Sequence, residues 1–259
     1  MSRLDRQKIK EELNMAQTKL PEFREEVDKL LLSFVDTFYK DVPNGEHFLN
    51  SEKVDKQYFI RNIIEIILRL RMKRCIDALT IHYFTKHAPV LAKEWAKYAD
   101  EEMLHDLWFG QDIKKMGVTN EEIYSTEPFF STKLLQGYFY YSLEHEGRPL
   151  ASLCSSYFIE MLSLVTQPKW VENCEKTFGP GSCEGQKRHL DTDTNEDHPL
   201  VAWNVLATFA KTDEDKEKIL DHMKNIYKLF VAYYTELSNE ILEKKKGVTP
   251  LTEKVLSHA

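Results

Sequence analysis

Residues 93–116 have the sequence KEWAKYADEEMLHDLWFGQDIKKM, in which apolar and aromatic side chains recur at three- and four-residue intervals. This spacing predicts a long amphipathic helix with one buried face. That face is formed by Trp95, Tyr98, Ala99, Glu102, His105, Phe109, Ile113 and Met116. Glu102 lies in its middle, where burial without a partner would cost a carboxylate several kcal/mol. Glu102 therefore needs a partner, and His105, one turn further on, is the nearest in the sequence.

The same helical periodicity recurs along the rest of the chain. Residues 20–40 carry another apolar stripe, which Pro21 opens in the first turn. One helix is expected over about 51–72, and a separate one follows it and ends at about Lys86. Further helices are expected over roughly 132–165, in a short segment after Pro168, and after Thr212. Sustained alternation with a period of two residues is absent, so no sheet is expected. The sequence therefore predicts an all-α, single-domain bundle of about eight or nine helices.

No Pro-, Gly- or Ser-rich stretch divides the chain into two halves, which favours one domain. Within it, residues 1–50 are expected to form N-terminal helices packed on the core. Residues 51–245 are expected to form the main bundle, and residues 246–259 a C-terminal tail.

The composition argues against several classes of protein. A net charge of −7 with no dominant basic stripe argues against nucleic-acid binding. No apolar run reaches the roughly 18 residues needed to span a membrane, and the charged N-terminus lacks a signal-peptide core, so we expect a cytoplasmic protein. Zinc knuckles are disfavoured because no CxxC pair occurs, and reduced thiols are expected at Cys75, Cys154, Cys174 and Cys183.

Two carboxylates lie in the aromatic-rich middle of the chain. Glu146 shares a helical stripe with apolar residues that include Phe139, whereas Glu144 shares its stripe with Arg148, four residues on. Glu144 therefore fits a surface salt bridge and Glu146 a buried ligand, and we take Glu146 as the candidate. Arg148 is also a candidate to bind a substrate carboxylate, because arginine makes bidentate contacts to such groups.

A third polar cluster begins at His189. Asp193 follows at i+4, so both side chains leave the same face of a helix, and Glu196, Asp197 and His198 come next. A solvated acidic loop that ends in a helix cap would explain the same residues. Their coincidence with two buried carboxylates elsewhere favours a metal site assembled from separated helices, and the ligand mix suits iron or manganese.

With these residues in place, the chain resembles the heme-oxygenase-like diiron oxidases and oxygenases over roughly residues 50–240. The resemblance rests on Glu-x-x-His at 102–105, on Glu146-Gly147, and on His-x3-Asp from His189 with a later histidine. It implies a heme-oxygenase-like bundle at 51–245 and two Fe(II) ions per chain. The implied ligands are Glu102, His105, Glu146, His189, Asp193 and His198.

The chain departs from the family pattern at its last motif. The family's final histidine falls where this chain has Glu196, and His198 comes two residues late, so it serves only if the helix is broken or bulged. Glu196 and Asp197 therefore also stay open as the last ligand. Some family members use a further carboxylate from an earlier helix, for which Glu65 is a candidate, although Arg61 and Arg69 at i−4 and i+4 fit a salt-bridge ladder equally well.

The resemblance implies an O2-dependent oxidase or oxygenase that acts on a small amino-acid or fatty-acid-like molecule. A second copy of the chain is a further potential partner. Two other functions stay open. One is a metal-independent, thiaminase-like hydrolase or a cofactor-independent oxidase, with a glutamate as acid/base and Cys154 as nucleophile. The other is a non-catalytic helical scaffold whose polar clusters are structural networks.

Overall fold

The structure is a computed structural model that describes residues 18–50, 52–195 and 197–245. All of the regular elements in these ranges are helices, so the predicted all-α class is confirmed. Their bounds are α2 Pro21–Asp41, α3 His47–Asn50, α4 Lys56–His87, α5 Pro89–Glu102, α6 His105–Lys114, α7 Asn120–Ser125, α8 Phe130–His145, α9 Leu150–Phe178, α10 Glu184–Asn195, α11 His198–Leu206, η1 Ala207–Phe209, α12 Asp213–Ser238 and η2 Asn239–Glu243. Residues 1–17 and the predicted tail at 246–259 lie outside the described ranges.

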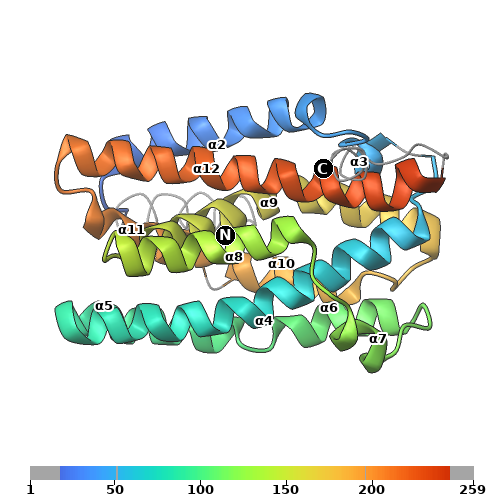
Figure 1. The fold of residues 1–259 in the computed structure, drawn as a ribbon, viewed down its shortest axis with the longest axis horizontal. Helices are drawn as coiled ribbons and strands as arrows, with labels where there is room; N and C mark the ends of the chain where they lie inside the picture. Colours follow the sequence, from blue (N-terminus) through green and yellow to red (C-terminus); the bar gives the residue numbers. More distant parts are fainter. Residues whose placement is uncertain (1–17, 51, 196, 246–259) are drawn as a thin grey trace, which may run out of the picture.

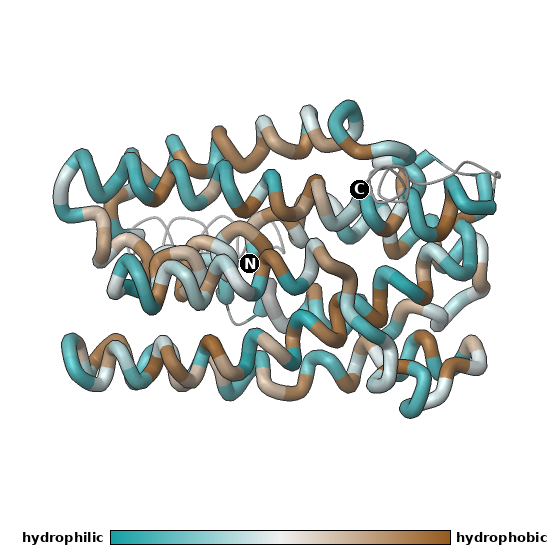
Figure 2. The backbone as a smooth tube through the Cα atoms, in the orientation of Figure 1, coloured by the Kyte–Doolittle hydropathy of each residue, from teal (hydrophilic) through white to brown (hydrophobic). Residues whose placement is uncertain are grey.

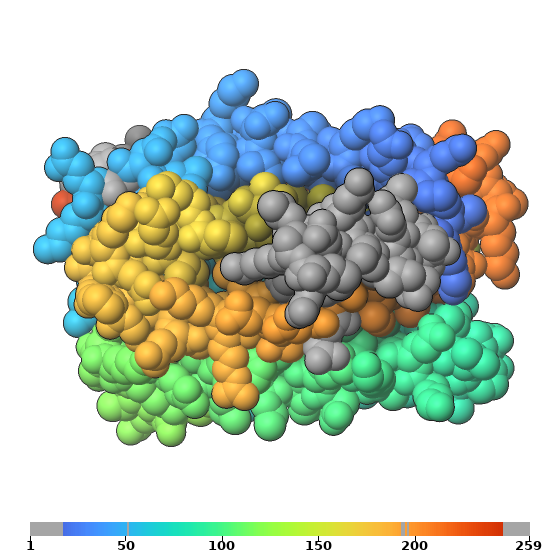
Figure 3. Space-filling model, turned by 180° about the vertical axis from the view of Figure 1, so that it is seen from behind, coloured from blue at the N-terminus to red at the C-terminus, as the bar shows by residue number. Residues whose placement is uncertain are grey.

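The long helices run along the longest axis of the molecule in layers (Figure 1). Helices α2 and α12 form one side, α4 to α7 the opposite side, and α8, α9 and α11 lie between them. Seen from behind, α9 and α10 separate α2 from the α4–α7 side (Figure 3). Helix α9 contacts α2, α8, α10, α11 and α12, so it is the central element of the bundle.

The outer helices alternate hydrophobic and hydrophilic residues along their length, as amphipathic helices do (Figure 2). The helices bury large side chains between them, and the largest fully buried ones are Trp95, Trp203, Tyr58, Tyr157 and Tyr233. None of the described helices is long and apolar enough to cross a membrane.

Two predicted helices are interrupted in the structure. The helix expected over 93–116 is divided into α5 and α6, because Leu104 leaves the helical conformation at φ −117° and ψ 10°. The helix expected over 132–165 is divided into α8 and α9 at Gly147, whose φ of +69° is one that L side chains rarely adopt. Two other expected breaks do not occur, since α4 is continuous from Lys56 to His87 and α9 continues through Pro168.

Candidate metal centre

The junction between α5 and α6 places a carboxylate and an imidazole side by side. Glu102 is the last residue of α5, and His105 is the first of α6. The short turn between them exposes Met103 and Leu104 and turns the two polar side chains inward. Nδ1 of His105 donates a hydrogen bond to Oε2 of Glu102 at 3.0 Å. The break between α5 and α6 thus brings together Glu102 and His105, the pair that the sequence predicted.

Helix α10 brings a second imidazole to this pair. Its N-terminus is held by Asp112 of α6, whose carboxylate accepts hydrogen bonds from the backbone amides of Gly185 (2.8 Å) and Gln186 (3.1 Å). One turn further along α10, His189 lies against His105, with ring centroids 4.7 Å apart. Glu102, His105 and His189 each offer one ligand atom, and these atoms lie within 4.8 Å of one another.

Helices α9 and α11 complete a second group of three on the other side of Glu102. Glu102, Glu160 and His198 also bring one ligand atom each within 4.8 Å. Nδ1 of His198 lies 3.1 Å from Oε1 of Glu102 and 3.9 Å from Oε1 of Glu160. Because Glu102 belongs to both groups, the five residues form one cluster that two metal ions can share.

Two neighbours orient the second group. Nε2 of His198 lies 3.2 Å from Oε2 of Glu101, which directs Nδ1 of the same ring towards Glu102 and Glu160. Tyr98 donates a hydrogen bond from its hydroxyl to Oε1 of Glu160 at 2.6 Å. A carboxylate that holds the outer nitrogen of a histidine is a common arrangement behind metal ligands, where it fixes the ring and its tautomer.

His198 reaches the cluster because the helix is broken just before it. Asp197 has a left-handed backbone conformation, with φ of +54°, and α11 begins at His198 with Pro199 in its first turn. This break is what the late position of His198 requires, so the structure supports His198 over Asp197 as the last residue of the site. Glu196 and the side chain of Asp193 lie outside the described residues.

The donors of the cluster fit a transition metal. His105 and His198 are fully buried, and Glu160 is only 3% exposed. Nε2 of His105 is buried without a hydrogen-bond partner in the described part of the chain, which suits a nitrogen that binds a metal. Burial raises the pKa of Glu102, but hydrogen bonds from His105 and His198 and the charge of His189 outweigh it and lower the pKa. Three imidazoles and two carboxylates are nitrogen and oxygen donors of the kind that non-heme iron sites use.

Glu146 does not join the cluster, which corrects the sequence prediction. It follows the last residue of α8, its side chain is 37% exposed, and its carboxylate accepts a hydrogen bond from Ser142 and lies 3.2 Å from Nε2 of His222. The prediction assumed one continuous helix through Gly147. The helix is broken there, so Glu146 does not share a face with the residues that follow the break. Glu160 of α9 takes the place expected of Glu146. The sequence around Glu160 has no neighbouring histidine that would have marked it as a candidate.

The remaining candidates also lie elsewhere. Arg148 pairs with Asp215 of α12 at 2.9 Å and is not among the residues that line a cavity of about 180 Å³ beside His189, so its contact with a substrate carboxylate stays a prediction. Glu144 is exposed on α8 as predicted, but its predicted salt bridge with Arg148 does not form among the described residues. Glu65 is fully buried but away from the cluster, where it binds Arg61 at 2.5 Å and accepts a hydrogen bond from Thr132.

The fold is shared with a protein of known structure. No protein-family model and no curated protein sequence matches the chain. A domain of unknown function with a heme oxygenase-like fold, from Shewanella denitrificans OS217, superposes with a TM-score of 0.75 at 20% identity. The match covers 86% of this chain and 95% of that one. At this identity the likeness concerns the fold alone, and it confirms that the chain has the heme oxygenase-like fold predicted from its sequence.

Proposed function

We propose that the protein is a non-heme iron oxidase or oxygenase that consumes O2 and acts on a small molecule at a two-iron centre. The observation that carries this proposal is the pair of three-residue donor groups joined through Glu102. Glu102, His105 and His189 would hold one iron, and Glu102, Glu160 and His198 the other. Asp193, one turn after His189 on α10, is proposed as a further ligand. Bound ferrous iron would supply the electrons that activate O2.

The chain's own residues prepare the site for that chemistry. Glu101 fixes the ring of His198, and the Tyr98 hydroxyl holds one oxygen of Glu160 in place. Trp95 and Phe109 are fully or almost fully buried near the cluster and limit the access of water. Exclusion of water strengthens each electrostatic contact and protects reactive species from side reactions.

Space for a substrate adjoins the cluster. A cavity of about 180 Å³ is lined by His189 and Phe109, together with residues of α2, α4, α8, α9 and α12. A smaller hollow of about 60 Å³ is lined by Glu102 and shares Leu70 and Lys73 with the larger one. A ligand in the larger cavity would therefore lie beside His189 of the first donor group, and Glu102, which belongs to both groups, lines the adjoining hollow. This adjacency supports an enzyme over a non-catalytic scaffold, which needs no cavity beside its polar groups.

The hydrolase alternative receives less support. Cys154 is fully buried, and burial raises the pKa of its thiol far above the usual value, whereas a nucleophilic cysteine needs an accessible thiolate. It also does not line the large cavity.

The proposal is tested by anaerobic addition of Fe(II) to the metal-free protein, followed by O2, with a metal count and Mössbauer spectra. We expect about two irons per chain and an O2-dependent change of the spectra. The substitutions Glu102→Ala and His189→Ala should each lower iron uptake, while Glu144→Ala, on an exposed part of α8, should not. Full iron uptake by both cluster variants, or none by the wild-type protein, would refute the proposal.

A further inference from the structure

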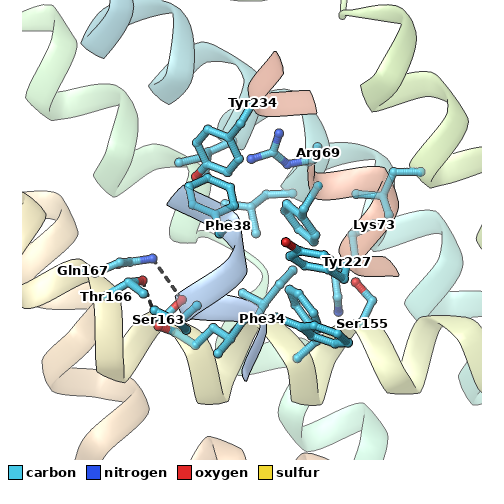
Figure 4. Close-up of a pocket in the computed structure, with 18 of the residues that line it drawn as sticks. Phe34, Phe38, Arg69, Lys73, Ser155, Ser163, Thr166, Gln167, Tyr227 and Tyr234 are labelled. Carbon is cyan, nitrogen blue, oxygen red and sulfur yellow. Dashed lines mark hydrogen bonds between the residues drawn. The ribbon is translucent and has the colours of Figure 1, made fainter. Parts of the chain in front are cut away.

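The large cavity beside the cluster has a distinctive lining (Figure 4). Aromatic side chains from α2, α8, α9 and α12 make up much of its wall, including Phe34, Phe38, Tyr39, Phe139, Phe158, Trp170, Tyr227, Phe230 and Tyr234. Such a wall favours a ligand with an apolar body, because burying apolar surface supplies most of the binding free energy.

The charges in the lining are of one sign. Arg69 and Lys73 of α4 both reach the cavity, and no aspartate or glutamate is among the described residues that line it. Lys73 is neutralised by Asp77, with contacts of 2.7 and 2.9 Å to the two carboxylate oxygens. Arg69 forms no ion pair with the described carboxylates, since Glu65, one turn before it, is bound to Arg61. Among the described residues, Arg69 is therefore the cation of the lining that has no counter-ion.

The guanidinium of Arg69 is held ready for an acceptor. It lies over the ring of Tyr233, 4.2 Å from the centroid, and Tyr233 is itself fixed by a hydrogen bond from its hydroxyl to Oδ1 of Asn62 at 2.7 Å. Nη1 of Arg69 is buried and has no hydrogen-bond acceptor in the described part of the chain. A buried donor without an acceptor costs stability, which a bound anion would recover. Figure 4 shows Arg69 beside Tyr234 at the edge of the aromatic wall.

We propose that Arg69 binds the carboxylate of an elongated, mainly apolar monocarboxylic acid whose body lies along the aromatic wall of the cavity. That this acid is the substrate rests on the function proposed above. A zwitterionic amino acid fits less well, because its ammonium group would find no carboxylate in the lining. Arginine suits the role because its planar guanidinium binds both carboxylate oxygens at once. The carboxylate is thus held by the protein, and the apolar body is the part left to face His189.

The test compares ligands of the same chain length that differ in their polar end groups, in metal-free protein, so that iron takes no part in binding. Octanoate, octan-1-ol and 8-aminooctanoate are titrated into the wild-type protein by calorimetry. We expect octanoate to bind about tenfold or more tightly than either of the others. The variant Arg69→Gln should lose that preference and Arg69→Lys should keep part of it. Arg71→Gln removes an exposed arginine of the same helix that lies over Tyr124, and it should bind like the wild type.

The outcomes separate this inference from the proposed iron chemistry. Equal affinities of the wild-type protein for octanoate and octan-1-ol, including no binding of either, would overturn the inference even if Arg69→Gln fails to fold. An equal loss in Arg69→Gln and Arg71→Gln would overturn it too, because it would indicate a general effect of charge. Iron uptake by a protein with no preference for the acid would refute only the role of Arg69. A preference for the acid in a protein that takes up no iron would refute only the metal centre.

Discussion

Glu160 and Glu146 are both mid-chain glutamates, but their surroundings differ. Glu160 is 3% exposed and contacts Tyr98 and His198, whereas Glu146 is more than a third exposed and lies against His222. Burial lowers the pKa of His222, and the Glu146 carboxylate only partly offsets this effect. The Glu146–His222 contact is thus a partly solvated pair that lies outside the cluster of Glu102, His105, Glu160, His189 and His198.

Replacing these two glutamates distinguishes the structural site from the one predicted by sequence. Glu160→Gln keeps the shape of the side chain but removes a charged ligand, so iron content should fall from about two to about one per chain. Glu146→Gln should retain full iron content. Both are measured by metal analysis after anaerobic loading and gel filtration, with circular dichroism to verify folding. Loss of iron in the Glu146 variant alone would show that the sequence prediction was the correct one.

At the level of residues, the sequence predicted those residues of the cluster that stand out from a local pattern. Glu102 and His105 were identified because they interrupt an apolar stripe, and the structure places both in the cluster with His189 and His198. Glu160 was missed because a single carboxylate in a long apolar helix has no neighbouring histidine to mark it. Its partners come from α5 and α11, and such contacts between helices have no spacing along the chain that a pattern can detect.

Among the helices, α10 depends on an unusually close contact with α6. A Cβ atom on Gly185 would lie 2.0 Å from the backbone carbonyl oxygen of Trp108, so only glycine permits the approach. The same contact allows Asp112 to bind the first amides of α10 and sets the position of His189. His189 therefore reaches Glu102 and His105 only if α10 keeps its close contact with α6.

Gly185→Ala should consequently damage both the fold and the site. The added methyl group must push α10 away from α6, so we expect a lower thermal midpoint and reduced iron uptake. Gly137→Ala is the matched control, since Gly137 is an exposed residue of α8 with no atom near its missing Cβ. It should stabilise the protein by about 0.5–1 kcal/mol, because alanine favours a helix over glycine. Thermal unfolding and metal analysis of both variants check this prediction, which unchanged iron uptake in Gly185→Ala would contradict.

Helical periodicity predicted which segments form helices more reliably than where they end. The apolar stripes of α2 and α4 and the start of α12 after Thr212 were apparent, but the breaks at Leu104 and Gly147 and the continuity of α4 were not. A stripe reports which side of a helix is buried, whereas a break is set by how neighbouring helices pack. The break before His198 was anticipated only as a condition for that residue to bind metal, and Asp197 satisfies it with its left-handed conformation.

In the whole molecule, the cluster connects five helices from three separate parts of the sequence. Glu102 comes from α5, His105 from α6, Glu160 from α9, His189 from α10 and His198 from α11. The unfolded chain does not bring these ligands together, so a metal bound by them favours the folded state. This effect distinguishes a preformed metal centre from adventitious binding to surface carboxylates.

Anaerobic Fe(II) should therefore raise the thermal midpoint of the wild-type protein. At a free concentration about 100 times the dissociation constant, the linkage contributes about 2.7 kcal/mol, which for a chain of this length corresponds to a rise of roughly 5–10 °C. Mg²⁺ at the same concentration should have little effect, because it prefers oxygen ligands and keeps its own water. In His189→Ala the iron-dependent rise should shrink, since the first donor group then lacks one of its three members. Differential scanning fluorimetry under nitrogen measures all three cases. An equal rise in the variant would place the stabilising iron outside this cluster, because a centre built from five helices cannot lose a ligand and hold its metal unchanged.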